Sequence, residues 1–218
     1  MSNSLRGPGF ALVIAAPSGA GKTTLARALV DRHSDVEFSV SATTRPKRKH
    51  EKGSRDYHFV DETEFIRMQE SGELLEWAVV HGRRYGTPRA EVEQRLKEGR
   101  VVVLDIDVKG AGQVRQALPQ AVLVFVLPPS AEELRRRLAT RDTEPDEERQ
   151  VRLQTARQEL RAAGLFDYII VNDDFEAAVK RLEAIVTAER AKISRSANLE
   201  QRIDALDKEL AKLLERKQ

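Results

Sequence analysis

A short loop of small residues, lying between an apolar segment and a Lys-Thr-Thr triplet, places the strongest constraint on how this chain folds. The segment Ala11–Ala15 is entirely apolar, residues 16–21 read APSGAG, and Lys22 begins a stretch with helical periodicity. This order of strand, loop and helix is typical of a Walker A phosphate-binding loop. Backbone N–H groups in such a loop turn toward phosphate oxygens, and the positive end of the helix faces the same anion.

The loop is expected to supply both backbone and side-chain ligands. Lys22 is predicted to contact the β- and γ-phosphates, and the Thr23 hydroxyl is predicted to bind Mg²⁺. Ala16 stands where the pattern has glycine, so this position either keeps a negative φ or stores strain. The alternative is a glycine-rich turn that only caps a helix. The residues assigned to the triphosphate are Ser18, Gly19, Ala20, Gly21, Lys22, Thr23 and Thr24.

Three further apolar segments have the composition of strands that are buried on both faces. They are Val101–Asp107, Ala121–Leu127 and Asp167–Asn172, and helical patterns separate them. Strands that alternate with helices in this way indicate an α/β domain with a mainly parallel sheet. Aromatic residues make up only 5% of the chain, so aliphatic side chains must build the core.

Shorter elements are predicted between these long strands. Val36–Thr43 alternates as a half-buried strand does, Leu74–Val80 is a second strand, and Gly82–Gly86 is a turn. Thr87 is predicted to cap a helix that ends near Gly99. Glutamate follows three residues after each of two further predicted N-caps, Asp61 and Ser130.

The composition limits the class of protein. With 218 residues, of which 40% are apolar, the chain is long enough for one large domain, or one domain with insertions, with its own core. A net charge of +2 gives no reason to expect a nucleic-acid partner, and the absence of cysteine excludes disulfides and thiolate metal sites. No signal peptide and no apolar run of about 18 residues is found, so we expect a cytoplasmic protein with no membrane partner.

Charged residues gather at one strand end and in two arginine-rich segments. Asp105 and Asp107 end a buried strand two residues apart and share a face, so one acid could hold Mg²⁺ and the other could face a substrate. The two clusters are Arg45, Arg48, Tyr57 and Tyr85, and Arg137, Arg141 and Arg152. Because guanidinium groups suit phosphate, this pattern predicts two phosphate-bearing substrates under a mobile lid that excludes water.

An ordered series of motifs resembles the guanylate kinase family over nearly the whole chain, to about Arg190. Phe38–Arg48 is similar to the family's SVS-x-TTR-x-x-R segment, and Asp56–Val60 follows at the family's spacing. The other matching motifs are Leu75–Ala78, Tyr85–Thr87, Leu104–Gly110, Pro128–Ser130 and Val171–Asp174. The resemblance implies a P-loop three-layer fold with a parallel central sheet, a small mixed α/β insertion that binds the nucleoside monophosphate, and a helical lid.

The resemblance also implies an activity, the phosphorylation of GMP and dGMP by ATP with Mg²⁺. The guanine contacts would be Ser41, Glu76, Thr87 and Asp107, since a carboxylate accepts from guanine N1–H and N2–H₂, which adenine does not offer. The other substrate-binding residues, chiefly for the GMP phosphate, would be Arg45, Arg48, Glu51, Tyr57 and Tyr85. The catalytic residues would be Lys22, Arg45, Arg137, Arg141 and Arg152. Thr23 and Asp105 would hold Mg²⁺, and Asn172 would lie at the adenine of ATP.

Some residues depart from the family's pattern, and two other functions stay open. The departures are Ala16, His50, Ser54, Arg83, Arg84 and Asp142, which bear on loop conformation and lid motion. One alternative is a kinase of another phosphorylated acceptor, of the ribose bisphosphate type, which would not need Glu76 and Ser41. The other is a non-catalytic binding module, which would not need Lys22, Thr23 and Arg137.

The implied division of the chain has four parts. The core comprises 1–37, 90–130 and 161–190, the GMP-binding part 38–89, the lid 131–160 and a helical extension 191–218. In the extension the apolar residues are spaced 4, 3, 4 and 3 apart, at Leu199, Ile203, Leu206, Leu210 and Leu213. Such a helix either docks on its own domain or pairs with a second subunit to form a homo-oligomer.

Overall fold

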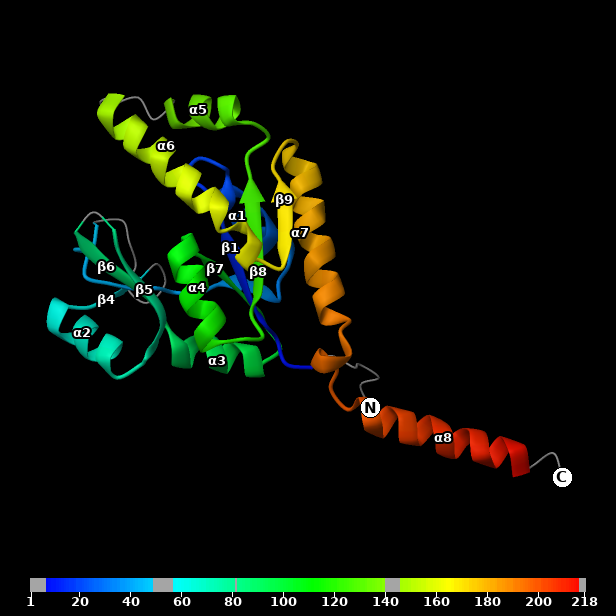
Figure 1. Ribbon diagram of the computed structural model, residues 1–218. Coiled ribbons are helices and arrows are strands. Elements are labelled where there is room, and N and C mark those ends of the chain that lie inside the picture. Colours follow the sequence, from blue (N-terminus) through cyan, green and yellow to red (C-terminus); the bar gives the residue numbers. More distant parts are fainter. Residues whose placement is uncertain (1–6, 49–56, 81, 140–145, 216–218) are drawn as a thin grey trace.

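A five-stranded sheet forms the centre of the molecule, shown in Figure 1 as a computed structural model. The structure describes residues 7–48, 57–80, 82–139 and 146–215. In spatial order the strands are β2 (Val36–Phe38), β7 (Val101–Asp105), β1 (Ala11–Ala15), β8 (Val122–Leu127) and β9 (Tyr168–Val171). All four pairings are parallel, which confirms the predicted α/β domain with a mainly parallel sheet.

Helices cover both faces of this sheet and make a three-layer fold. They are α1 (Lys22–Arg32), α3 (Arg89–Lys97), α4 (Val108–Ala117) and α7 (Phe175–Arg190). Successive residues of a strand point to opposite faces. Accordingly Leu12 and Ile14 pack with residues of α1 and α7, whereas Ala11 and Val13 pack with residues of α3 and α4. The uniformly apolar sequence of β1 is therefore explained by burial on both faces.

A second, mixed sheet lies beside the first, at the left of Figure 1. Its strands, in spatial order, are β4 (His58–Phe59), β3 (Ala42–Thr43), β6 (Arg83–Pro88) and β5 (Leu74–Val80). Helix α2 (Glu62–Glu70) covers one face, and Asp61 caps it as predicted, because its side chain accepts from the Glu64 N–H at 2.8 Å. The core of this unit is small and consists of Ala42, Phe65 and Leu74.

Three local predictions are wrong. The segment Val36–Thr43, predicted as one strand, forms two strands that belong to different sheets. The alternation of apolar and polar residues indicates a half-buried strand but does not identify the strand with which it pairs. Most of the predicted turn Gly82–Gly86 belongs to strand β6, which pairs with β5. Thr87 lies in β6 and does not cap α3, whose N-cap is Pro88. The Thr87 hydroxyl is instead used in the candidate site described below.

Two helices, α5 (Ala131–Ala139) and α6 (Asp146–Arg161), lie over the carboxyl ends of the central strands (Figure 1). Leu134, Leu138 and Ala156 join them in a small apolar cluster. Ser130 caps α5 as predicted, with its hydroxyl accepting from the Glu133 N–H at 3.1 Å. Short 3₁₀ turns at Ala163–Leu165 and Ile193–Arg195 precede β9 and the last helix, α8 (Leu199–Glu215). Among the described residues, no helix has the length and apolar character needed to cross a bilayer.

The small core of the second sheet makes it sensitive to one substitution. Phe65 is fully buried, and we expect Phe65→Ala to destabilise this sheet by about 3–5 kcal/mol. Because the central sheet has its own core, the loss should be local. Hydrogen exchange followed by mass spectrometry should show faster exchange in peptides from 57–80, with β1 and β8 unchanged. Ile66→Ala, at a half-buried neighbour, should have a smaller effect. Equal acceleration in both sheets would contradict this division.

Candidate active site

The loop after β1 surrounds a cavity of about 460 Å³ at the carboxyl edge of the central sheet. Lys22 Nζ lies 2.6 Å from Asp105 Oδ1, at the end of the neighbouring strand β7, and donates to the Ile106 carbonyl at 2.8 Å. Among the described residues, only Asn198 is a non-glycine with positive φ, so Ala16 carries no strain of that kind. The departure from glycine at this position is therefore compatible with a phosphate-binding conformation.

Gly21 and Asn172 explain why the loop needs its last glycine. Gly21 has a φ of 92°, and a Cβ atom there would lie 2.4 Å from Asn172 Nδ2. Asn172 is buried and donates from Nδ2 to the Ala20 carbonyl at 2.8 Å. Asn172, the side chain predicted to lie at adenine, therefore stabilises the phosphate loop by a hydrogen bond to its backbone.

Arg137 of α5, in the predicted lid, contacts this loop. Its guanidinium donates to Glu133 Oε1 at 2.7 Å and to the Ala20 carbonyl at 3.4 Å. The guanidinium groups of Arg136 and Arg137 hold the pKa of Glu133 down to about 2, so this carboxylate stays charged and keeps Arg137 oriented. Arg137 also lines the cavity.

The residues predicted to hold Mg²⁺ lie together. The Thr23 hydroxyl donates to Asp105 Oδ2 at 2.6 Å, so a hydroxyl and a carboxylate oxygen face the same space. These are the hard oxygen ligands that Mg²⁺ prefers, and Mg²⁺ is usually held by one or two such groups together with phosphates and waters. No cluster of three or more His, Asp or Glu side chains that could hold a metal occurs in the described part of the chain. The donor set therefore fits a metal ion that arrives with a nucleotide.

A buried carboxylate lies next to the phosphate loop. Glu76 of β5 is 5% exposed and accepts a 2.6 Å hydrogen bond from the fully buried Thr87 hydroxyl of β6. Burial raises the pKa of Glu76 to about 7, Asp107 adds to the rise, and Lys22 opposes it. Gly110 lies beside both Glu76 Oε2 and Asp107 Oδ1, and Asp107 lines the phosphate-loop cavity together with Lys22, so the two halves of the predicted site lie close together.

Glu76 packs closely against the start of helix α4. A Cβ atom on Gly110 would lie 2.9 Å from Glu76 Oε2, so only glycine fits at that point of α4. Ser41 directly precedes Ala42, which pairs with Gly86, and so Ser41 lies beside Thr87 in the sheet. Asp107, predicted to contact guanine, caps α4 by accepting from the Gly110 N–H at 2.7 Å and also lines the phosphate-loop cavity. Its capping role was missed by the sequence analysis.

The first arginine cluster is largely assembled. The Arg45 guanidinium lies 5.3 Å from the Tyr57 ring centroid, and the Tyr57 and Tyr85 rings are 6.0 Å apart. Arg48 is exposed at the end of a described range, and Arg152 is half-buried on α6. Glu51 and Arg141, with the departures His50, Ser54 and Asp142, lie outside the described residues. Arg84 forms an ion pair with Glu62 of α2.

Two polar residues near the site were not predicted. Glu159 of α6 lines the phosphate-loop cavity, burial raises its pKa, and it accepts from the Ser18 backbone N–H. Its position seven residues after Arg152 places both on one face of a helix, which is the signal that could have found it. Gln113 of α4 bonds both the N–H and the carbonyl of Trp77, at 3.1 and 2.9 Å, and so holds β5 beside the site.

The raised pKa of Glu76 predicts a pH-dependent stability. The folded protein binds this proton more tightly than the unfolded chain, so the contribution is favourable below the unfolded pKa and is lost as pH rises toward 7. Glu76→Gln cannot ionise, so its free energy of unfolding lacks this pH dependence. Relative to the unsubstituted protein, the free energy of unfolding of Glu76→Gln should therefore be higher at pH 8 than at pH 5 by on the order of 3 kcal/mol. Denaturant unfolding at both pH values measures this, with exposed Glu70→Gln as the control. An equal difference at pH 5 and pH 8 would refute the shift.

The family model for guanylate kinase matches residues 9–189, which include the phosphate loop, both sheets and the described part of the lid. The guanylate kinase of Thermotoga maritima is 48% identical over 188 residues, covering 86% of this chain and 91% of that protein. The guanylate kinase of Anaeromyxobacter dehalogenans is 50% identical over 185 residues, covering 84% of this chain and 82% of that protein.

A solved structure agrees with these sequence matches. The crystal structure of guanylate kinase from Anaplasma phagocytophilum is 36% identical and superimposes with a TM-score of 0.73, covering 91% of this chain and 95% of that one. Matches of this extent include the whole central sheet and the Glu76 region together. The chain belongs to the guanylate kinase family.

Proposed function

We propose that this protein transfers the γ-phosphoryl group of ATP to GMP, and to dGMP, yielding ADP with GDP or dGDP. The observation that carries the proposal is the buried Glu76–Thr87 pair, which lies beside Gly110 and close to Asp107, a residue that lines the phosphate-loop cavity. A phosphate loop alone would fit many nucleotide-binding proteins. A buried carboxylate beside it calls for a ligand with two adjacent N–H donors, which guanine has. The substrates are cytoplasmic metabolites, and we propose that the protein acts there.

The donor triphosphate is proposed to lie in the phosphate-loop cavity. Backbone N–H groups of residues 18–24 would bind its oxygens, and Lys22 would exchange its ion pair with Asp105 for the β- and γ-phosphates. Thr23 and Asp105 would hold Mg²⁺, which when bound neutralises charge on the transferring group. Asn172, which donates a hydrogen bond to the Ala20 carbonyl, would stabilise the conformation of the loop and lie next to the adenine.

The acceptor base is proposed to be read by hydrogen bonds that adenine cannot make. Ionised Glu76 would accept from guanine N1–H and N2–H₂, while the Thr87 hydroxyl holds the carboxylate in place. Ser41 and Asp107 would complete the contacts to the base. Adenine has an acceptor at N1, so its binding would leave a buried carboxylate without donors, which is costly.

The acceptor phosphate is proposed to lie between the arginine–tyrosine cluster and the lid. Arg45, Arg48, Tyr57 and Tyr85 would position it so that one of its oxygens attacks the γ-phosphorus in line, with ADP leaving. Glu51 is proposed as a further substrate-binding residue. Three lid arginines, Arg137, Arg141 and Arg152, would stabilise charge on the equatorial oxygens. The lid would also exclude water, so that the group goes to GMP and is not hydrolysed.

Base selectivity tests the proposal directly. ADP release should be measured with GMP, dGMP, AMP, CMP and UMP for the unsubstituted protein and for Glu76→Gln. We expect turnover with the guanine nucleotides. We expect a loss of selectivity in Glu76→Gln, because the N–H₂ group of the glutamine amide would face the N–H donors of guanine. The preference for GMP over AMP should fall by about 10²-fold or more. The exposed substitution Glu70→Gln is the control. Unchanged selectivity, or turnover with none of the acceptors, would overturn the proposal.

The charge of Lys22 should act on the transfer step more than on acceptor binding. We expect Lys22→Ala to lower kcat by about 10²–10³, as loss of one electrostatic donor to a transition state does. GMP affinity, measured by calorimetry well above pH 7 so that Glu76 is ionised in both proteins, should change little because Lys22 is assigned to the donor. Lys180→Ala, at an exposed position of α7, is the matched control. A near-normal kcat in Lys22→Ala would rule out the assigned role.

A further inference from the structure

Strand β5 departs from regular pairing at the point where it carries Glu76. Leu74 pairs with Pro88 and Trp77 pairs with Gly86, so β5 advances by three residues while β6 advances by two. The extra residue forms a β-bulge, which interrupts the ladder and bends the strand that contains it. Glu76 lies within this bulge, and its direction is therefore constrained less by the pairing with β6 than it would be in a regular ladder.

The outer edge of β5 is bonded by a side chain of another element. Within the described part of the chain β5 is the last strand of its sheet, so the backbone groups on its outer side face no further strand. The Gln113 amide of α4 occupies this place. It donates from Nε2 to the Trp77 carbonyl at 2.9 Å, and its Oε1 accepts from the Trp77 N–H at 3.1 Å. One amide thus bonds both backbone groups of the residue that follows Glu76, as a neighbouring strand would.

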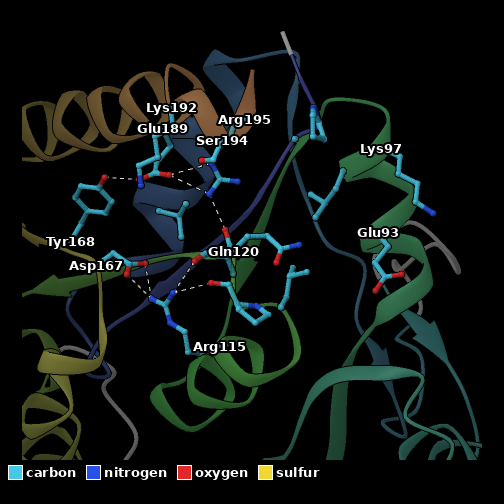
Figure 2. Close-up of a pocket in the computed structure, with 17 residues that line it drawn as sticks. Glu93, Lys97, Arg115, Gln120, Asp167, Tyr168, Glu189, Lys192, Ser194 and Arg195 are labelled. Atoms are coloured by element: carbon cyan, nitrogen blue, oxygen red, sulfur yellow. Dashed lines mark hydrogen bonds and ion pairs between the residues drawn. The ribbon is translucent and has the colours of Figure 1, made fainter. Parts of the chain in front are cut away.

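Helix α4, which carries Gln113, is fixed on the central sheet. Ala111 and Val114 of this helix are buried in the core. Arg115 donates to both carboxylate oxygens of Asp167 at 2.7 Å, at the amino end of the sheet, as Figure 2 shows. The two bonds of Gln113 therefore connect β5 to an element whose own position is determined by the core, which is the kind of support that holds a functional side chain in place.

The same face of α4 also contacts the Glu76 side chain. Gly110 lies three residues before Gln113, and residues with this spacing lie on one side of a helix. The space beside Gly110 is taken by Glu76 Oε2, 2.9 Å from the position that a Cβ atom would have. The Thr87 hydroxyl bonds the other carboxylate oxygen. Helix α4 thus meets β5 at two successive residues, at the side chain of Glu76 and at the backbone of Trp77.

We propose that Gln113 is a positioning residue for guanine selectivity. Its amide fixes on α4 the backbone that follows Glu76, and so determines the direction in which the carboxylate is presented to the base. The Trp77 N–H belongs to the peptide unit that begins with the Glu76 carbonyl, and this unit is planar, so a bond to it restricts Glu76 directly. Gln113 does not contact the base in this role. The inference rests on the proposed function, because it assigns Gln113 to a selection that Glu76 is proposed to make.

Steady-state kinetics at pH 8, above the pKa of Glu76, test this role. Gln113→Met keeps the length of the side chain and loses both hydrogen bonds. We expect the KM for GMP to rise, and the preference for GMP over AMP to fall, by about tenfold or more, because a small displacement of a group that orients a substrate is costly. The KM for ATP should change little. Gln116→Met, at an exposed position of the same helix, is the matched control. A KM for GMP and a preference equal to those of the control would overturn the role.

A second background shows whether Gln113 acts through Glu76. In Glu76→Gln, the further substitution Gln113→Met should change the preference for GMP by less than about twofold, because the group that Gln113 positions is already lost. An equal loss of preference in both backgrounds would overturn the inference, since a general loss of structure acts regardless of Glu76. Gln113→Asn, whose amide is one methylene shorter, provides the same test should Gln113→Met not fold.

Fluorescence tests the contact without turnover, because Trp77 is the only tryptophan of the chain. Local motion of Trp77, measured by anisotropy decay, should be faster in Gln113→Met than in Gln116→Met. Turnover of GMP with unchanged anisotropy and selectivity in Gln113→Met would overturn the role of Gln113 alone. No turnover with any acceptor in the unsubstituted protein would instead overturn the proposed function, and this inference with it.

Discussion

The contact between the phosphate loop and Asp105 is the interaction on which the candidate site depends. Lys22 and Thr23 lie at the start of α1, and Asp105 ends the neighbouring strand, yet both side chains bond its carboxylate at 2.6 Å. They meet because β1 and β7 are parallel and in register, with Ile14 opposite Asp105. Parallel strands bring their carboxyl ends to one edge, where ligands bind in folds of this kind. The order of strands in the sheet thus determines where the phosphates of a nucleotide are bound.

Glu76 connects this edge with the second sheet. A carboxylate that is 5% exposed, with a pKa near 7, is costly to ionise in the absence of a ligand. The surrounding structure reduces that cost only in part, through the Thr87 hydroxyl, which bonds one of the two carboxylate oxygens. Such a group is expected where a ligand supplies the missing donors. The buried Glu76 therefore lowers the stability of the ligand-free protein, and the same residue would give the selectivity for guanine.

Much of the fold could be predicted because its signals are local. The apolar run of β1, the small-residue loop and the Lys-Thr pair lie within fifteen residues of one another, and the capping residues Asp61 and Ser130 act over three residues. The wrong predictions concern pairing at a distance. Nothing in the alternation of Val36–Thr43 says that β2 and β3 join different sheets. Likewise, Thr87 has the properties of a helix cap, and only the register of β5 with β6 directs its hydroxyl to Glu76.

The most direct measurement is the number of protons released when GMP binds. Calorimetric titrations in buffers of different ionisation enthalpy should show that the protein loses about half a proton at pH 7, because guanine would convert Glu76 from a group with a pKa near 7 to a fully ionised one. The release should disappear in Glu76→Gln, apart from any contribution of the GMP phosphate itself. Equal release by both proteins would contradict the account, since guanine would then bind without ionising this carboxyl group.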